Sequence, residues 1–341
     1  MLKPTPTQPP MTAARQQAGL HDYLRIARFD HMTKHVFIVP GIILALLLRP
    51  QAASALSQGQ FWFDLVLGFA AAVFVASANY VINEWLDREF DRFHPEKSQR
   101  AAVQREMAPG IVIAEYLVFL ALGLGLAYAI NQTFLLAAIL LAVSGITYNV
   151  NPIRTKDRVY GDVLSESLNN PIRLLMGWAI VDATTLPPAS LFLAFWFGGA
   201  FLMNSKRLAE YRDIVASDGA EILGRYRRSF RYYTENKLSV ANLVYALSCA
   251  FFMAIFLIKY RVEYVVLFPC IVALFAVYYA LALQPDSVAR KPEKLYNSKP
   301  VIMTTAVTLA VFLLVTFVDI PVLEGYTSQT FITLPFAETP E

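Results

Sequence analysis

The chain has 341 residues, of which 56% are hydrophobic and 16% are charged, and its formal net charge is +3. Soluble domains carry about 25% charged residues, so this composition excludes an ordinary water-soluble globule. The apolar residues fall in runs of roughly 18 or more, long enough for a helix to cross the ~30 Å hydrocarbon core of a bilayer, and the sequence therefore predicts an all-α polytopic membrane protein.

Nine transmembrane helices are predicted in chain order, between two tails. Residues 1–22, rich in Pro, Thr and Gln near their start, are expected to form a disordered cytoplasmic tail. The helices are expected at 35–52, 60–83, 108–130, 133–150, 163–182, 187–204, 239–258, 263–283 and 301–319. The fifth is the weakest, because polar residues such as Glu166 and Arg173 interrupt it. Residues 323–341 are expected to form a C-terminal tail on the non-cytoplasmic side.

Basic residues predict the orientation of these helices. Of the 29 Lys and Arg residues, 25 precede the first span or lie in the loops 84–107, 151–162, 205–238 and 284–300. The positive-inside tendency places these loops and the N-terminus in the cytoplasm, for a multi-pass protein of the cell (inner) membrane. The basic loops indicate contact with phosphate groups or anionic lipid headgroups, and no nucleic-acid partner is expected. Cys249 and Cys270 lie inside apolar runs and indicate neither a disulfide framework nor a zinc site.

The first polar cluster lies at the end of the second predicted helix. Asn79, Asn83, Asp87 and Asp91 follow one another at four-residue steps, which places them along one helix face. Like charges at this spacing repel, so a cation in front of the face would stabilise it. Mg²⁺ fits best, because it takes amide and carboxylate oxygens and shares its remaining positions with substrate phosphates. The alternative is a helix end neutralised by its own ion pairs.

The residues after this helix favour a metal-diphosphate site. Lys97 and Arg100 follow the acidic face at once, and such bases hold the charge of a diphosphate that the metal leaves unneutralised. The motif Asn83-Glu84-x-x-Asp87-x-x-x-Asp91 resembles the NDxxDxxxD motif of the UbiA superfamily of intramembrane prenyltransferases, and His94-Pro-x-Lys97-x-x-Arg100 resembles the basic segment that follows it. Two departures are Glu84 in place of Asp and Ala101 where a Pro commonly stands.

The resemblance implies a fold and a metal site. It implies nine transmembrane helices of UbiA type around a central lipid-accessible cavity, a catalytic domain over residues 23–322, and an active site that opens to the cytoplasm. It also implies Mg²⁺ as cofactor. The implied metal ligands are Asn83, Glu84, Asp87 and Asp91.

A second motif follows the sixth predicted helix. Family members carry an acidic DxxxD motif there, whereas this chain has Lys206-Arg207-x-x-Glu210, so the charge balance is inverted. Two polar-ended helices, each followed by a cationic loop, also predict a divergent internal duplication. The Lys-Arg-x-x-Glu pattern resembles the polyprenyl-phosphate (decaprenyl-phosphate) phosphoribosyltransferase branch of the superfamily.

This branch resemblance implies the remaining site residues. The implied catalytic residues are Asn83, Asp87, Asp91, Lys206 and Glu210. Substrate phosphates are expected at Lys97, Arg100, Lys156, Arg173, Lys206 and Arg207. Additional polar ligands are expected at Tyr148, Asp162, Glu166, Asn170, Tyr211 and Asp213. The arginines Arg225, Arg227, Arg228 and Arg231 are expected either to clamp a ribose 5-phosphate or to face lipid headgroups.

The predicted activity is Mg²⁺-dependent displacement of diphosphate. The preferred reaction moves 5-phosphoribose from phosphoribosyl diphosphate onto a polyprenyl phosphate. The first alternative is prenyl transfer from a polyprenyl diphosphate to an aromatic or quinone-precursor acceptor, which would be favoured if Glu210 and Asp213 act as the second acidic motif. A transporter of lipid or solute is a remote alternative, because it does not explain why carboxylates and phosphate-binding bases lie only on the cytoplasmic side.

Overall fold

The computed structural model describes residues 16–93, 97–284, 287, 289 and 298–326, and in this part of the chain the secondary structure is helical. Its helices are α1 (Leu20–Ile26), α2 (Ile38–Leu48), α3 (Gly59–Asp91), α4 (Ala101–Gln104), α5 (Pro109–Ile130), α6 (Gln132–Asn149), α7 (Gly161–Ser167), α8 (Asn169–Val181), α9 (Ala189–Asp218), α10 (Leu223–Tyr226), α11 (Glu235–Tyr260), α12 (Phe268–Ala282) and α13 (Lys299–Phe317). Short 3₁₀ turns join them, among them η1 (Phe29–Phe37), η3 (Lys97–Gln99), η4 (Thr155–Asp157), η6 (Arg228–Arg231) and η7 (Val262–Leu267).

Local sequence explains where several long helices begin. Pro109 opens α5, where its missing N–H leaves no intrahelical bond unmade. A single residue, Asn131, separates α5 from α6, and its side-chain oxygen accepts from the Phe134 N–H as an N-cap. Thr234 caps α11 in the same way through the Lys237 N–H.

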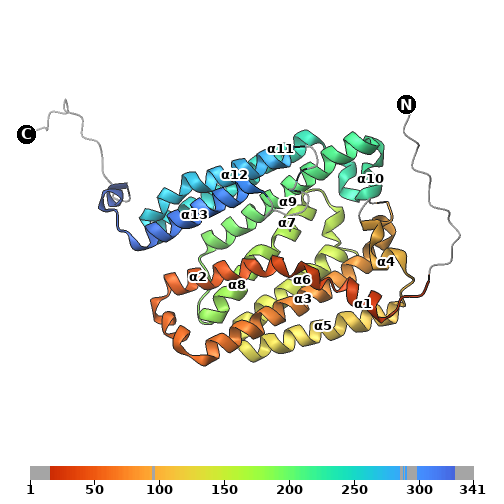
Figure 1. The fold of residues 1–341 in the computed structure, drawn as a ribbon, viewed down its shortest axis with the longest axis horizontal. Coiled ribbons are helices and arrows are strands. Elements are labelled where there is room, and N and C mark those ends of the chain that lie inside the picture. Colours follow the sequence, from red (N-terminus) through yellow and green to blue (C-terminus); the bar gives the residue numbers. More distant parts are fainter. Residues whose placement is uncertain (1–15, 94–96, 285–286, 288, 290–297, 327–341) are drawn as a thin grey trace, which may run out of the picture.

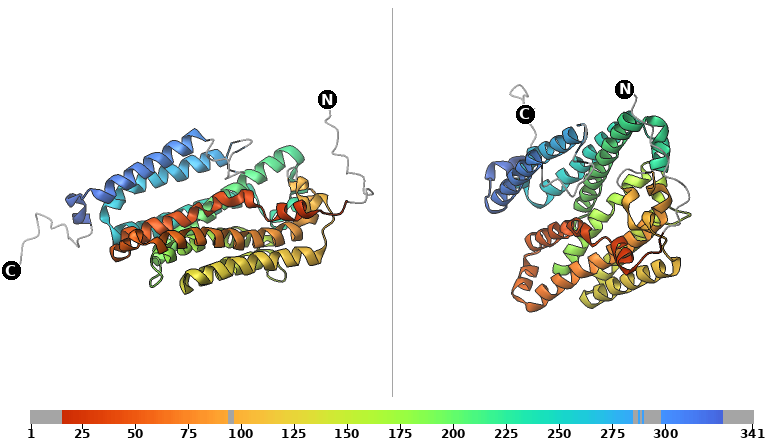
Figure 2. Two further views of the ribbon diagram at one scale, coloured as in Figure 1. Left: turned by 60° about the horizontal axis from the view of Figure 1, so that its bottom comes forward. Right: turned by 45° about the vertical axis from the view of Figure 1, so that its right-hand side comes forward.

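The helices form two neighbouring groups (Figures 1 and 2). The first contains α2, α3, α5 and α6, and the second contains α9, α11, α12 and α13. In the first group Asn79 of α3 donates to the Leu141 carbonyl of α6 at 2.9 Å, and in the second Asn204 of α9 donates to the Leu238 carbonyl of α11 at 2.7 Å. An asparagine on the polar-ended helix of each group thus binds a neighbouring helix, which supports the expected duplication.

The expected count of nine spans is not confirmed. Among the described helices, six are long and apolar enough to cross a membrane, namely α3, α5, α6, α11, Val262–Ala282 and α13, and the bent pair Leu20–Met32 and Lys34–Leu48 brings the number to seven. The expected span 163–182 is broken at Leu168 into α7 and α8. Although α9 has 30 residues, its apolar stretch runs directly into Lys206 and Arg207.

The expected N-terminal tail is ordered in its last part. Residues 16–22 were expected to be disordered, but Gln17 forms a β-bridge with Glu106 and α1 begins at Leu20. The Ala18 N–H donates to the Glu106 carbonyl at 2.9 Å, which holds this segment against the turn after α4. The expected tail residues 1–15 and 327–341 lie outside the described residues, as does most of the fourth basic loop.

Two glycines let α2 and α8 approach at backbone distance. A Cβ added at Gly177 would lie 2.0 Å from the Ile38 carbonyl oxygen, and one added at Gly41 would lie 2.1 Å from that of Leu174. Only glycine permits such an approach, because any side chain would overlap the facing backbone. This crossing places Arg173, one turn before Gly177, next to the turn η1 with its Lys34 and His35.

Gly177→Ala is expected to lower the unfolding free energy by about 1–3 kcal/mol, because the new methyl group would overlap the Ile38 carbonyl. Thermal unfolding in detergent would measure the loss. Gly125→Ala on α5 is the matched control, since a Cβ there meets nothing within 4 Å. Equal melting temperatures for the two variants would contradict the close approach of α2 and α8.

Candidate active site

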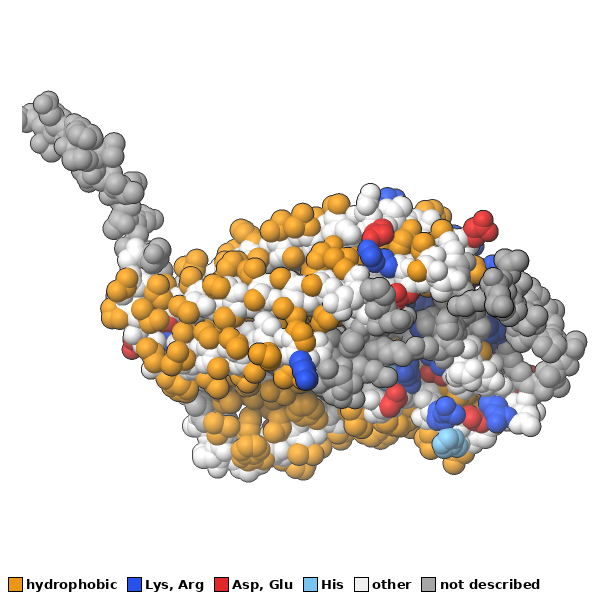
Figure 3. Space-filling model, turned by 45° about the horizontal axis from the view of Figure 1, so that its top comes forward, with side chains coloured by type: hydrophobic (Ala, Val, Ile, Leu, Met, Phe, Trp, Pro, Cys, Tyr) orange, Lys and Arg blue, Asp and Glu red, His pale blue; other side chains and the backbone are white. Residues whose placement is uncertain are grey.

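Charged side chains gather at one end of the bundle, and the rest of the visible surface is mainly hydrophobic (Figure 3). The last turns of α3, the turn η4 after α6, the helix α7 and the second half of α9 supply them. This separation agrees with a protein that spans a membrane and exposes its polar groups at one interface. The site residues form two clusters there.

The first, named here the α3 cluster, consists of Asn83, Asp87, Asn149, Arg154 and Lys156. Its centre is the Lys156 ammonium, which lies 2.6 Å from the Asp87 carboxylate, 2.7 Å from the Asn149 side-chain oxygen and 3.1 Å from that of Asn83. The Arg154 guanidinium donates to the same Asp87 oxygen at 2.8 Å. The helix face that was predicted to hold a cation therefore does hold one, but that cation belongs to the chain itself.

A reversal of the chain after α6 brings these two bases to α3. Arg154 has φ +25° and Tyr160 has φ +60°, values that turn the backbone on itself around η4. Arg154 also donates to the Asn149 carbonyl at 2.8 Å and to Asp157 at 3.0 Å, which secures the turn. Burial lowers the pKa of Lys156 to about 8, with Arg154 also lowering it, although Asp87 acts in the opposite direction.

The other two predicted metal ligands, Glu84 and Asp91, face the basic turn after α3. Arg100 donates to Asp91 at 2.5 Å, and the buried Glu84 carboxylate accepts from the Ala102 N–H. Burial lowers the pKa of Lys97 to about 8, and the nearby Glu210 raises it. Residues 94–96 lie outside the described residues. Asn83 and Asp87 thus both contact Lys156, whereas Glu84 and Asp91 bind the segment that leads into α4.

The second group, named here the Arg207 cluster, forms around a buried guanidinium on α9. Arg207 lies 2.8 Å from Glu166, 3.1 Å from Glu210 and 3.5 Å from Asp162. Three carboxylates on α7 and α9 therefore share one arginine that is 2% exposed. Among the described residues, no three His, Cys, Asp or Glu side chains converge in a way that suits a metal ion.

Asp162, Tyr148 and Arg227 join this cluster to the neighbouring loops. Asp162 is fully buried and accepts hydrogen bonds from Tyr233 at 2.6 Å and Ser229 at 3.1 Å. The Tyr148 hydroxyl donates to Glu166 at 3.1 Å, and Arg227 reaches both Tyr148 and Asp162. The Lys156 ammonium lies 5.7 Å from the centre of the Tyr148 ring, so Tyr148 separates the two clusters.

Arg173 and Lys206 supply further positive charge without an ion pair to a described residue. Neither lies within 4 Å of a carboxylate in the described part of the chain, and Arg173, which is 6% exposed, makes its hydrogen bond to the Asn169 carbonyl at 3.3 Å. The Nε of Arg173 finds no hydrogen-bond partner among the residues that the structure describes. Lys34 adds a further cation 5.5 Å from the centre of the Tyr80 ring. Buried Arg173 and the half-buried Lys34 and Lys206 together favour an anionic ligand.

Other predicted ligands have different surroundings. Asn170 packs against Gly199 of α9, where a Cβ would lie 2.3 Å from its amide nitrogen, so its role is helix packing. Tyr211 packs against Phe230, away from the two clusters. Asp213, further along α9, stays a prediction.

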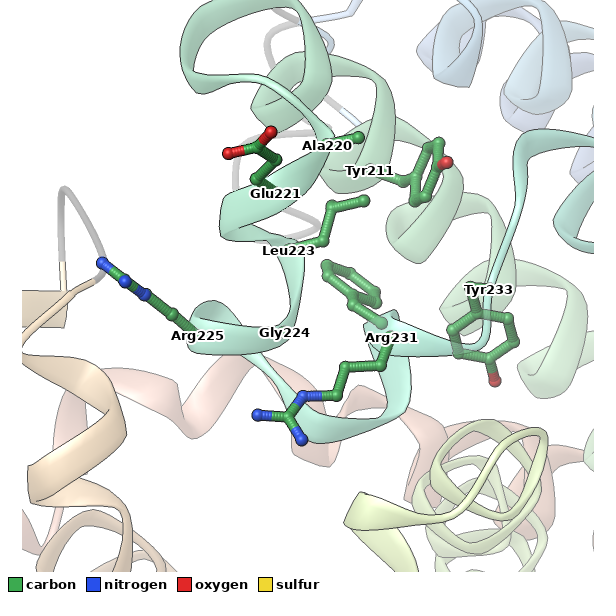
Figure 4. Close-up of a pocket in the computed structure, with 9 residues that line it drawn as sticks. Tyr211, Ala220, Glu221, Leu223, Gly224, Arg225, Arg231 and Tyr233 are labelled. Carbon is green, nitrogen blue, oxygen red and sulfur yellow. The ribbon is translucent and has the colours of Figure 1, made fainter.

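The four arginines expected to clamp a ribose 5-phosphate or to face lipid headgroups have different surroundings. Only Arg227 enters the Arg207 cluster, whereas Arg228 binds Asp157 and lies over the Phe90 ring. Arg225 and Arg231 line a separate cavity of about 440 Å³ with Tyr211, Glu221 and Tyr233, and their guanidinium groups point in different directions (Figure 4). Charge spacing in the sequence did not reveal this, because the short helix α10 turns the arginines apart.

Sequence reasoning missed Asn149 and Arg154. Asn149 is the last residue of the apolar helix α6, next to Tyr148, and it is buried. A polar residue at the end of an apolar span could have indicated a functional role. Arg154 was read only as one charge of a cytoplasmic loop. Between Tyr148 and Lys156 the chain folds back toward α3, which brings Arg154 and Lys156 to Asp87.

The described helices, with acidic and basic side chains gathered at one end, are those of a multi-pass membrane protein. A model described as the UbiA prenyltransferase family matches residues 40–299, and the chain belongs to this family. A relative, the nodulation protein NoeC of Azorhizobium caulinodans, is 30% identical over 196 residues, which make up 56% of this chain and 59% of NoeC. The match thus spans less than two thirds of that relative.

Solved structures share the fold. A UbiA homologue from Archaeoglobus fulgidus, bound to DMAPP and Mg²⁺, has a TM-score of 0.64 at 21% identity, over 87% of this chain and all of the other. The structure of the same homologue bound to GPP and Mg²⁺ has a TM-score of 0.63 at 22% identity, with the same coverage. A structure of digeranylgeranylglyceryl phosphate synthase has a TM-score of 0.56 at 17% identity, over 87% of this chain and 96% of the other.

Proposed function

We propose that this UbiA-family protein is a Mg²⁺-dependent transferase that moves 5-phosphoribose from phosphoribosyl diphosphate onto a polyprenyl phosphate. The observation that carries the proposal is the charge of the second half of the site. There Arg207 pairs with both Glu166 and Glu210, while Arg173 and Lys206 stay without a carboxylate partner among the described residues. Such a site favours two phosphorylated substrates over one metal-bound diphosphate.

Mg²⁺ suits the α3 cluster. Asn83 and Asp87 present an amide and a carboxylate oxygen that already hold a cation, the Lys156 ammonium, at 3.1 Å and 2.6 Å. Hard oxygen ligands of this kind are what Mg²⁺ takes in phosphate-binding sites. The A. fulgidus homologue, which binds Mg²⁺ with isoprenoid diphosphates, supports this assignment through the shared fold. When bound, the ion would supply charge neutralisation for the departing diphosphate.

The chain's own residues would divide the remaining tasks. Lys97 and Arg100, after α3, would hold the diphosphate, and Arg173 with Lys206 would orient the phosphate of the lipid. The bond from C1 of the ribose to diphosphate breaks, and a bond from C1 to a phosphate oxygen of the lipid forms. That oxygen is already anionic, so no side chain has to accept a proton. The active site would open at the cytoplasmic face of the cell membrane, the N-terminal side of the chain.

Prenyl transfer to an aromatic acceptor remains the second candidate, because the similar folds were solved with DMAPP and GPP. The pairing of Glu210 with Arg207 disfavours it, since a second acidic motif would need that carboxylate for metal.

Purified protein in lipid nanodiscs, given Mg²⁺, ribose-labelled phosphoribosyl diphosphate and polyprenyl phosphate, is expected to form a labelled lipid that organic solvent extracts. EDTA or omission of the lipid should abolish the product. A parallel reaction with labelled polyprenyl diphosphate and an aromatic acid tests the second candidate. Product in that reaction alone would overturn phosphoribosyl transfer.

A further inference from the structure

Three side-chain oxygens converge on a single ammonium group in the α3 cluster. The oxygens belong to Asn83 and Asp87 of α3 and to Asn149 of α6, and all lie between 2.6 and 3.1 Å from the Lys156 nitrogen. Two of them were expected as metal ligands, whereas neither the motif nor its spacing points to Asn149. The arrangement is a preformed oxygen site for a cation, with contributions from two helices.

The orientation of Asn149 shows that its oxygen belongs to this site. Its side-chain nitrogen donates to the Gly145 carbonyl at 2.9 Å, one turn back on α6, which directs the oxygen toward Lys156. A flipped amide would place its NH₂ group against the ammonium and its oxygen against a carbonyl, losing both hydrogen bonds. The side chain is 2% exposed, so water offers no substitute.

A lysine ammonium and a divalent ion cannot share this position. Both need the same three oxygens, and two cations at such short range repel strongly where water is scarce. Lys156 is 4% exposed and Arg154 also contacts Asp87, so the position carries considerable positive charge before any metal arrives. Metal entry therefore requires the ammonium to leave.

We propose that Asn149 is a third ligand of the divalent ion and that the Lys156 ammonium occupies the ion's position in the metal-free protein. The inference rests on the proposed function, because it assigns the metal to the α3 cluster. Lys156 thereby competes with the metal as well as neutralising Asp87. Removal of the Lys156 ammonium should therefore raise the metal affinity, and removal of the Asn149 oxygen should lower it.

Mn²⁺ titration of the full-length protein in nanodiscs, followed by electron paramagnetic resonance, tests this inference without any turnover. Lys156→Met, which keeps the length of the chain without the charge, is expected to bind Mn²⁺ about tenfold more tightly than the wild type, and Asn149→Ala about tenfold more weakly. Asn149→Asp keeps the oxygen, adds a charge and is expected to bind more tightly. Lys237→Gln, at an exposed lysine of α11, is the matched control and should leave the affinity unchanged.

A second measurement covers the case in which Asn149→Ala fails to fold. In the wild type, Mg²⁺ is expected to raise the rate at which an amine-specific reagent labels Lys156, as read by mass spectrometry, because the released ammonium becomes accessible. Unchanged labelling, unchanged affinity of Lys156→Met, or equal affinities of Asn149→Asp and wild type would each overturn the inference. If instead the wild type binds no Mn²⁺ and transfers no label, the proposed function itself fails.

Discussion

Asp87→Asn is expected to reduce the transfer rate by roughly 10³-fold and to leave the bundle folded. Asp87 is the carboxylate that both Lys156 and Arg154 contact, at 2.6 and 2.8 Å, and under the proposed function it is the charged ligand of the metal. Loss of a group that stabilises developing negative charge typically costs 10²- to 10³-fold, and loss of the ion's charged ligand belongs at the upper end. In the variant, Arg154 retains its ion pair with Asp157, at 3.0 Å, so the turn η4 should stay in place.

The rate of label transfer to lipid, at saturating concentrations of both substrates, measures this loss. Glu89→Gln is the matched control, because Glu89 lies two residues further along α3, is exposed and pairs with Arg92 at 2.8 Å. It should retain near wild-type activity. Full activity of Asp87→Asn, with normal folding, would remove the metal from the α3 cluster.

Arg207→Met is expected to lower the unfolding free energy by about 3–5 kcal/mol, because it leaves Asp162, Glu166 and Glu210 close together without their shared cation. Methionine fills most of the volume, so the effect reports the lost charge. Activity should fall as well, since Glu166 also accepts from the hydroxyl of Tyr148, whose ring lies beside Lys156 of the α3 cluster.

Thermal unfolding in detergent, compared with Arg212→Ala, tests this expectation. Arg212 lies five residues further along α9 and pairs with Glu235 at the surface, where both side chains are more than a third exposed. Exposed pairs contribute at most about 1 kcal/mol. Similar losses in the two variants would show that Arg207 is not the centre of a buried network.

The sequence predicted those features that follow from local patterns. Long apolar runs indicated the helices, and the four-residue spacing of Asn83 and Asp87 placed their side chains on one face, as the structure confirms through their common partner Lys156. The inverted charge of the second motif was likewise apparent from the sequence, and its Arg207 contacts Glu166 and Glu210 in the structure. Periodicity and charge are sufficient for such predictions because each depends on residues within one helix.

Contacts between distant segments could not be predicted in this way. The pairing of Arg154 and Lys156 with Asp87 depends on backbone reversal at η4, which no pattern of apolar residues encodes. The break at Leu168 is similar, since it separates α7, which carries Asp162 and Glu166, from the buried helix α8. Asn79, read with the metal-binding face, instead fits against Gly145 on α6. In each case tertiary packing decides which of two plausible roles a polar side chain takes.

The length of α3 bears on how a lipid reaches the reacting groups. Its 33 residues extend over about 50 Å, whereas hydrocarbon fills only about 30 Å of a bilayer. If the apolar N-terminal part of the helix occupies that layer, its last turns emerge at the depth of the headgroups. Under the proposed function, a polyprenyl phosphate would then present its phosphate at the depth of the last turns of α3 while its tail stays among the acyl chains, so the protein need not extract it from the membrane.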